Sequence, residues 1–199
     1  MMSKNYLPLI AKKFFLLAVA LLASHSAQAN FHFVLTETVD GVLLSGSGSA
    51  DHSSFIKVML GDKNPISGGG LYPGFAIGSV GNGLIDVFDG GIPDSGPAAF
   101  GEGSSYLAAT SGTGDAFGFD FGFGGAFLLL PEGYVANEVL TGTGYYDSET
   151  FESLGVSVGS YQWVFSDGQT VHLTVVPEPA TAGLLMSLVL CAFVATRRR

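Results

Sequence analysis

Glycine spacing is the feature that most restricts how this 199-residue chain can fold. The sequence holds 29 glycines, and all except Gly183 lie between residues 30 and 176. They recur every few positions and divide the apolar sequence into pieces of strand length, which are too short for packed helices. The spacing therefore predicts an all-β domain over residues 30–175.

Alternation of side chains predicts the strands of this domain. The segment 115–123 has one phenylalanine face (Phe117, Phe119, Phe121 and Phe123), which should form much of the core. Further strands are predicted at 31–39, 42–46, 55–60, 75–77, 83–88, 126–130, 161–165 and 170–175.

Turn sequences connect these strands into hairpins. Asp40-Gly41 predicts a two-residue type I′ turn, which needs positive φ at both central positions, and Ser166–Gln169 predicts the last hairpin. Glycines and prolines between residues 61 and 114 predict long loops between short strands. The predicted architecture is an antiparallel β-sandwich, jelly-roll or Ig-like, of about eight to ten strands.

A weak internal echo links residues 45–55 with residues 141–151. Both follow the pattern small-Gly-small-Gly-x-x-Asp-x-x-hydroxyl-Phe. It indicates either a duplicated strand-and-turn unit, one copy in each sheet, or coincidence in a chain rich in Gly, Ser and Thr.

The N-terminal residues 1–29 are typical of a signal peptide. Three lysines precede an apolar run at 14–23, and Ala27-Gln28-Ala29 forms a small-x-small site for signal peptidase. We expect cleavage before Asn30; a retained N-terminal anchor is the alternative.

The C-terminal residues 176–199 predict a membrane anchor. Residues 180–196 carry no charge, and their 17 positions are close to the minimum for a transmembrane helix. We expect Arg197, Arg198 and Arg199 to act as a stop-transfer signal on the cytoplasmic side of the membrane.

Pro177, Glu178 and Pro179 precede this helix, and the complete arrangement resembles the PEP-CTERM sorting signal of exopolysaccharide-producing Gram-negative bacteria. An ordinary tail anchor with incidental prolines is the alternative. The resemblance implies that a membrane protease, exosortase, removes the tail, and that the protein passes from a membrane-anchored precursor to the cell surface or the extracellular matrix.

A second resemblance covers the C-terminal third of the domain. Residues 128–134 (LLLPEGY), 150–155 (TFESLG) and 159–163 (GSYQW) are similar to a domain that recurs in PEP-CTERM proteins. Such proteins are described as secreted and of unknown function, so the likeness implies no catalytic residue.

Charge and cysteine content exclude several functions for the exported part. Sixteen of the 17 acidic residues lie between residues 30 and 176, where Lys57 and Lys63 are the basic ones, which gives a formal charge of −14. Such a domain repels phosphate backbones, so nucleic acid is not an expected partner. The sole cysteine of the chain, Cys191, lies in the predicted membrane helix. No disulfide or thiol chemistry is therefore expected in the exported domain.

Candidate catalytic and metal-binding residues are few. Gly155-Val156-Ser157-Val158-Gly159 fits the G-x-S-x-G pattern, yet a hairpin rather than a helix is predicted after it. His32 and His172 are expected on polar strand faces, and no histidine pair has the spacing of a metal site. We therefore predict no catalytic residue and no histidine metal site.

Bound calcium is the one cofactor left open. Asp86 and Asp89 lie beside glycine-containing turns at 82–83 and 90–91, and Gly112-Thr113-Gly114-Asp115 loosely resembles a calcium-binding turn. None of these matches a calcium loop with ligands at fixed offsets.

The function expected from these features is a structural or interaction role in the exopolysaccharide or biofilm matrix, without enzymatic activity. One alternative is a carbohydrate-binding or adhesion module that stacks sugars on tyrosines (Tyr72, Tyr145, Tyr146 or Tyr161). The other is a secreted hydrolase that uses Ser157.

Overall fold

The computed structural model describes residues 30–62, 66–68, 73–80, 84–102, 107–121 and 125–177. This part of the chain is all-β, as predicted. The predicted signal peptide, membrane helix and arginine tail lie outside the described residues. Within the described ranges, no helix is long and apolar enough to cross a membrane.

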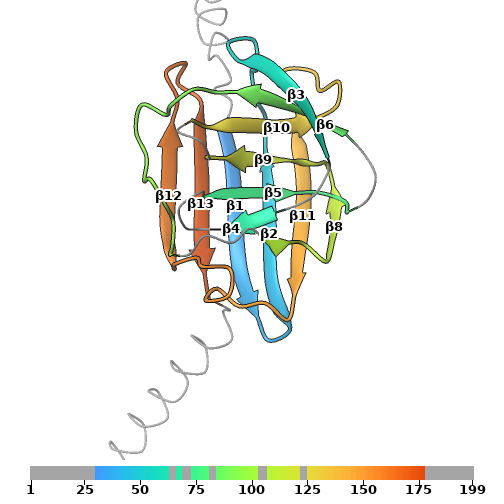
Figure 1. Cartoon of the computed structure of the whole chain (residues 1–199), viewed down its shortest axis with the longest axis vertical. Helices are drawn as coiled ribbons and strands as arrows, with labels where there is room; N and C mark the ends of the chain where they lie inside the picture. The colour runs from blue at the N-terminus through green and yellow to red at the C-terminus, as the bar shows by residue number, and fades with distance from the viewer. Residues whose placement is uncertain are drawn as a thin grey trace, which may run out of the picture.

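The strands form two sheets that face each other, and the strands of one sheet lie across those of the other (Figure 1). The first sheet has the order β12 (Gly159–Val164), β13 (Thr170–Val176), β1 (Asn30–Thr38), β2 (Gly41–Gly48), β11 (Leu140–Asp147) and β8 (Ser111–Gly114). The second has the order β3 (Ile56–Asp62), β6 (Leu84–Asp89), β10 (Phe127–Pro131), β9 (Phe117–Asp120), β5 (Gly74–Ile77), β4 (Ile66–Gly68) and β7 (Leu107–Ala108).

Aromatic rings fill the space between the sheets. Phe31 and Phe33 of β1 are almost fully buried, and their rings lie 5.5 Å from that of Phe117 on β9. Phe33 also packs edge-on against Phe75 of β5, with ring centroids 4.7 Å apart. The predicted phenylalanine face of residues 115–123 is therefore confirmed at Phe117 and Phe119, which are both buried.

One strand pair is parallel, which departs from the predicted antiparallel arrangement. β1 pairs with β13 in parallel register, from Asn30 opposite Thr170 to Thr36 opposite Val176, and the other pairs in both sheets are antiparallel. Alternation alone predicts which residues face the core, but it does not give strand direction.

The first hairpin exists, but its predicted turn is wrong. Thr38 pairs with Gly41, so Val39 and Asp40 form the loop rather than Asp40 and Gly41. Neither loop residue has a positive φ, which excludes a type I′ turn. Gly41 instead begins β2 with a φ of 155°, and a Cβ there would lie 2.3 Å from the carbonyl oxygen of Tyr146.

The two copies of the echo lie side by side in the first sheet, so the expectation of one copy in each sheet is wrong. Ser45 and Ser47 of β2 pair with Thr143 and Thr141 of β11 in antiparallel register. Between them, Gly46 of β2 is directly opposite a glycine of β11.

This glycine row continues to the sheet edge, because Gly142 of β11 pairs in turn with Gly114 of β8. A Cβ on Gly46 would lie 2.8 Å from Ile77 Cδ1, which comes from the second sheet. The missing side chains therefore let β5 approach closely. The residue after β5 bonds to the first sheet, since Gly78 N donates to the Thr143 carbonyl at 3.0 Å.

The alternation of side chains did not predict four of the strands. The two sheets therefore contain more strands than the eight to ten that were expected. β4, β7 and β8 have only two to four residues each, and β11 was recognised only as part of the echo. β9 is shorter than predicted and ends at Asp120.

We expect Gly112→Ala to lower the free energy of unfolding by about 1–3 kcal/mol, the usual cost of overpacking. A Cβ at this position of β8 would lie 2.1 Å from the Gly78 carbonyl oxygen, and backbone cannot move aside easily. Gly125→Ala is the control, because its nearest new neighbour would be 3.7 Å away. Urea unfolding of both variants tests the idea, and equal stabilities would contradict it.

Candidate functional site

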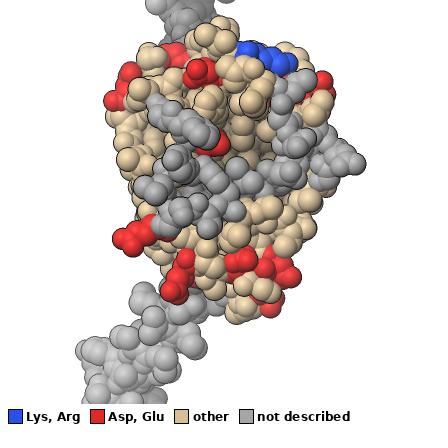
Figure 2. All heavy atoms as spheres, in the orientation of Figure 1, with Lys and Arg blue, Asp and Glu red and all other residues tan. Residues whose placement is uncertain are grey.

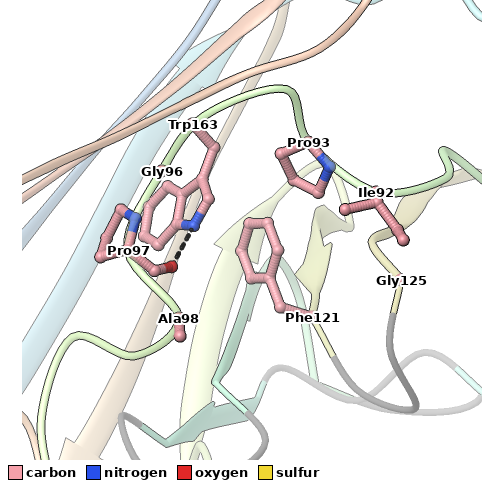
Figure 3. A pocket seen from close by; sticks show the side chains of 8 residues that line it. All are labelled: Ile92, Pro93, Gly96, Pro97, Ala98, Phe121, Gly125 and Trp163. Atoms are coloured by element: carbon pink, nitrogen blue, oxygen red, sulfur yellow. Dashed lines mark hydrogen bonds between the residues drawn. The ribbon is translucent and has the colours of Figure 1, made fainter.

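A pocket of about 300 Å³ lies next to Trp163 of β12 (Figure 3). Phe121, just after β9, stacks on this indole with ring centroids 4.6 Å apart. The loop after β6 supplies most of the remaining wall, and the indole Nε1 donates to the Pro97 carbonyl at 2.9 Å. The lining residues are Ile92, Pro93, Gly96, Pro97, Ala98, Phe121, Gly125 and Trp163.

The side chains that line this pocket are apolar or aromatic. Its described lining has no carboxylate, imidazole, hydroxyl or amine side chain, so it offers no group for acid–base or nucleophilic catalysis. The Trp163 ring is only 1% exposed and its N–H is already bonded, so it provides no open platform for a sugar ring. These side chains offer apolar contact, and polar contact in the pocket would come from the backbone.

The outer surface of the first sheet has a different character. Strand register places hydroxyl side chains across neighbouring strands, and Thr113 Oγ1 lies 2.9 Å from Thr143 Oγ1. We call this surface the hydroxyl face; its hydroxyl residues are Thr36, Thr38, Ser45, Ser47, Ser111, Thr113, Thr141, Thr143, Ser160, Thr170 and Thr174, and His32, Val34, Leu43, Tyr145, Gln162, Val164, His172 and Val176 lie among them.

Charge is nearly absent from the hydroxyl face. Asp147, at the end of β11, is the charged residue among the outward positions of these six strands. On the opposite side of the molecule, Figure 2 shows acidic side chains gathered toward two ends. The strongly acidic domain therefore has one sheet face that is rich in hydroxyl groups and nearly uncharged.

Two histidines meet on this face. His32 of β1 pairs directly with His172 of β13, and their rings stack with centroids 4.9 Å apart and an interplanar angle of 10°. Both lie on polar strand faces, as predicted. The sequence offers no sign of their contact, since 140 positions separate them and the parallel pairing of β1 with β13 brings them together.

Partial burial of His172 and the nearby charge of His32 lower the pKa of His172 below its usual value. The folded state therefore holds this proton less tightly than the unfolded chain. Stability from this group is present above the unfolded pKa of about 6.5 and is lost as the pH falls through the lower, folded value.

We therefore expect His172→Gln to flatten the decline in melting temperature between pH 7 and pH 5, measured in chelator-treated buffer. His52→Gln serves as the control, because His52 lies against Phe88 and Tyr134, away from this pair. If the wild type and the His172→Gln variant lose stability in parallel over this range, the stacked pair does not carry the effect.

Ser157 lies exposed in the turn region before β12. Its backbone N–H donates to the Phe100 carbonyl at 2.9 Å, and its own carbonyl accepts a bond from the Tyr161 hydroxyl at 2.9 Å. The segment that follows is strand β12, not the helix that a nucleophile elbow requires. The local structure therefore lacks the context of the G-x-S-x-G chemistry.

The candidate sugar-stacking tyrosines do not form a common platform. Tyr146 is fully buried between the sheets, and Tyr161 packs inward against Phe100. Tyr145 is half-buried on the outer side of β11, and Tyr72 lies outside the described residues. Stacking on a shared tyrosine surface thus has no support from these positions.

The acidic residues proposed for calcium have protein partners. Buried Asp86 forms an ion pair with Lys57, with Oδ1 2.6 Å from Nζ although the contact lacks the geometry of a good hydrogen bond. Asp89 Oδ1 accepts a bond from Gly91 N, and Asp115 Oδ2 accepts one from Thr141 N. Within the described ranges, no three His, Cys, Asp or Glu side chains gather as metal ligands. Calcium binding stays an untested prediction.

Of the predicted sorting residues, the structure describes Pro177, which is exposed directly after β13. Glu178, Pro179, the arginine tail and the signal-peptidase site at Ala27 and Ala29 lie outside the described residues. Comparison of the chain with family models, curated proteins and solved structures finds no match. The functional argument therefore depends on the residues and their geometry.

Proposed function

We propose that this protein is exported and processed through its C-terminal sorting signal, and that its β domain has a structural or interaction role in the exopolysaccharide matrix. The observation that carries the proposal is the hydroxyl face, a flat polar surface with almost no charge on a domain of formal charge −14. Signal peptidase, the inner membrane and exosortase would be its transient partners.

The chemistry of the hydroxyl face suits a polysaccharide. Each Ser or Thr hydroxyl can donate one hydrogen bond and accept others, which matches the hydroxyl groups of sugars. Gln162 and the two imidazoles add further donors and acceptors. Because the face is nearly uncharged, it avoids the repulsion that acidic polysaccharides would meet elsewhere on the domain.

The relative direction of β1 and β13 is consistent with a precursor that is anchored at its C-terminal end. Since β1 and β13 are parallel, the described chain enters the first sheet at Asn30 at one end and leaves it at Pro177 at the other (Figure 1). An anchor after Pro177 would hold the domain by one end and leave the hydroxyl face open along its length. We further propose that the two facing sheets constitute a β-sandwich of the jelly-roll or Ig-like kind.

A carbohydrate-binding or adhesion module is the second candidate, and the hydroxyl face favours it more than the tyrosines do. In this form the same surface would bind one glycan selectively instead of contacting the matrix broadly. A hydrolase that uses Ser157 gains no comparable support.

We expect the full chain to co-sediment with exopolysaccharide from its host, and the double variant Ser47→Glu, Thr141→Glu to bind about tenfold more weakly, a loss of about 1.4 kcal/mol. The two side chains are exposed neighbours on β2 and β11, so the new carboxylates would charge the centre of the face. Ser166→Glu, in the exposed turn before β13, is the control. Equal binding by all three proteins would contradict a role for this face, and selectivity on a glycan array would favour the second candidate.

The sorting step has its own test. Mass spectrometry of the protein from its native host should find a mature N-terminus at Asn30 and no peptide beyond about residue 179, as the PEP-CTERM resemblance implies. Glu178→Ala should leave the tail in place. Recovery of Arg197–Arg199 on wild-type surface material would contradict exosortase processing, whatever the domain binds.

A further inference from the structure

His32 and His172 are the two titratable side chains at the centre of the hydroxyl face. Their strands are adjacent and parallel, and the rings stack almost face to face at 4.9 Å. His32 is exposed and His172 half-buried, so solvent reaches the pair. Two neighbouring imidazoles with no acidic partner at the paired positions are unusual for a purely structural contact, because protonation of both would bring like charges together.

We propose that His32 and His172 form a two-histidine site for a divalent transition metal such as Cu²⁺ or Zn²⁺. Imidazole nitrogen is a preferred ligand of these ions, whereas Ca²⁺ and Mg²⁺ prefer oxygen. The site is distinct from the acidic turns considered for calcium, and it does not depend on the proposed matrix role.

Metal binding requires the two imidazole rings to turn, because their planes are now almost parallel and a bound ion lies in the plane of each ring. With metal–nitrogen distances of about 2.0–2.1 Å and tetrahedral angles, the two coordinating nitrogens must come to within about 3.3 Å of each other. The ring centroids are 4.9 Å apart, and the terminal torsion of histidine is broad, so rotation of the rings can bring one nitrogen of each toward a common ion. The paired backbones fix the spacing of the two Cα atoms, which makes the arrangement pre-formed.

The surroundings allow an open coordination site. Gln162 of β12 pairs with His172 on one side, and Ser47 of β2 pairs with His32 on the other. Neither of these neighbours is titratable, so no fixed charge opposes the cation. Because the described residues hold no cluster of three His, Cys, Asp or Glu, the protein supplies two imidazoles, while water or a matrix ligand completes the shell.

Isothermal titration of the untagged full chain in detergent with Cu²⁺ and with Zn²⁺ tests the site. We expect one ion per chain, with Cu²⁺ bound more tightly, as the general affinity order predicts. His32→Gln and His172→Gln should each weaken binding about a hundredfold, the lower end of the gain from joining two binding groups. His52→Gln should bind as the wild type does.

Electron paramagnetic resonance of the Cu²⁺ complex gives a readout that folding defects would not mimic. The wild type should show two coordinating imidazole nitrogens, and each single variant should show one. Circular dichroism melts would show whether the variants are folded. Wild-type affinity in a variant that carries both His32→Gln and His172→Gln, or a loss in His52→Gln as large as in His32→Gln, would overturn the proposal.

Discussion

The parallel pairing of β1 with β13 joins the two ends of the described chain, and much of the domain depends on it. It places β1 inside the first sheet, so that Phe31 and Phe33 reach the rings of β5 and β9 from a strand supported on both sides. The same pairing sends the chain out of the sheet at the end opposite to its entry. It also brings His32 against His172, which no local feature of the chain would do.

Glycine has two roles in this protein. Along the chain it keeps the apolar segments short, which favours strands over helices. In the folded domain, Gly46 of β2 and Gly142 of β11 leave room for Ile77, and Gly112 of β8 leaves room for the Gly78 backbone that follows it. The close approach of the two sheets is therefore a consequence of side chains that are missing, and it explains why the Gly-Ser and Gly-Thr repeats occur in paired strands.

The pocket and the hydroxyl face differ in the polar side chains that they present. The side chains that line the pocket beside Trp163 are apolar, and the indole N–H already donates a hydrogen bond to the Pro97 carbonyl. The hydroxyl face has many donors and acceptors but no depth, which suits extended polymers better than small molecules. The histidine pair adds two neighbouring imidazoles to that face, and they form the proposed metal site.

Alternation predicted the inward phenylalanines of β9 and the outward positions of His32 on β1 and His172 on β13 correctly, because the period of two is a property of the extended backbone itself. The short strands β4, β7 and β8 were missed, since two to four residues carry too little pattern to detect. The predicted first turn is displaced by one residue from the observed one. Thr38 pairs with Gly41, and this pairing leaves Val39 and Asp40 as the loop.

By itself, the sequence determined the all-β class and the core side of the phenylalanine strand β9, which follow from residue type and local order, and it predicts the sorting signals. Only the tertiary structure decided that the glycine-containing strands β2 and β11 are neighbours and that His32 contacts His172. It also decided that Tyr146 is buried while Ser157 is exposed. These outcomes depend on strand direction and register between distant segments, and local sequence patterns do not encode either one.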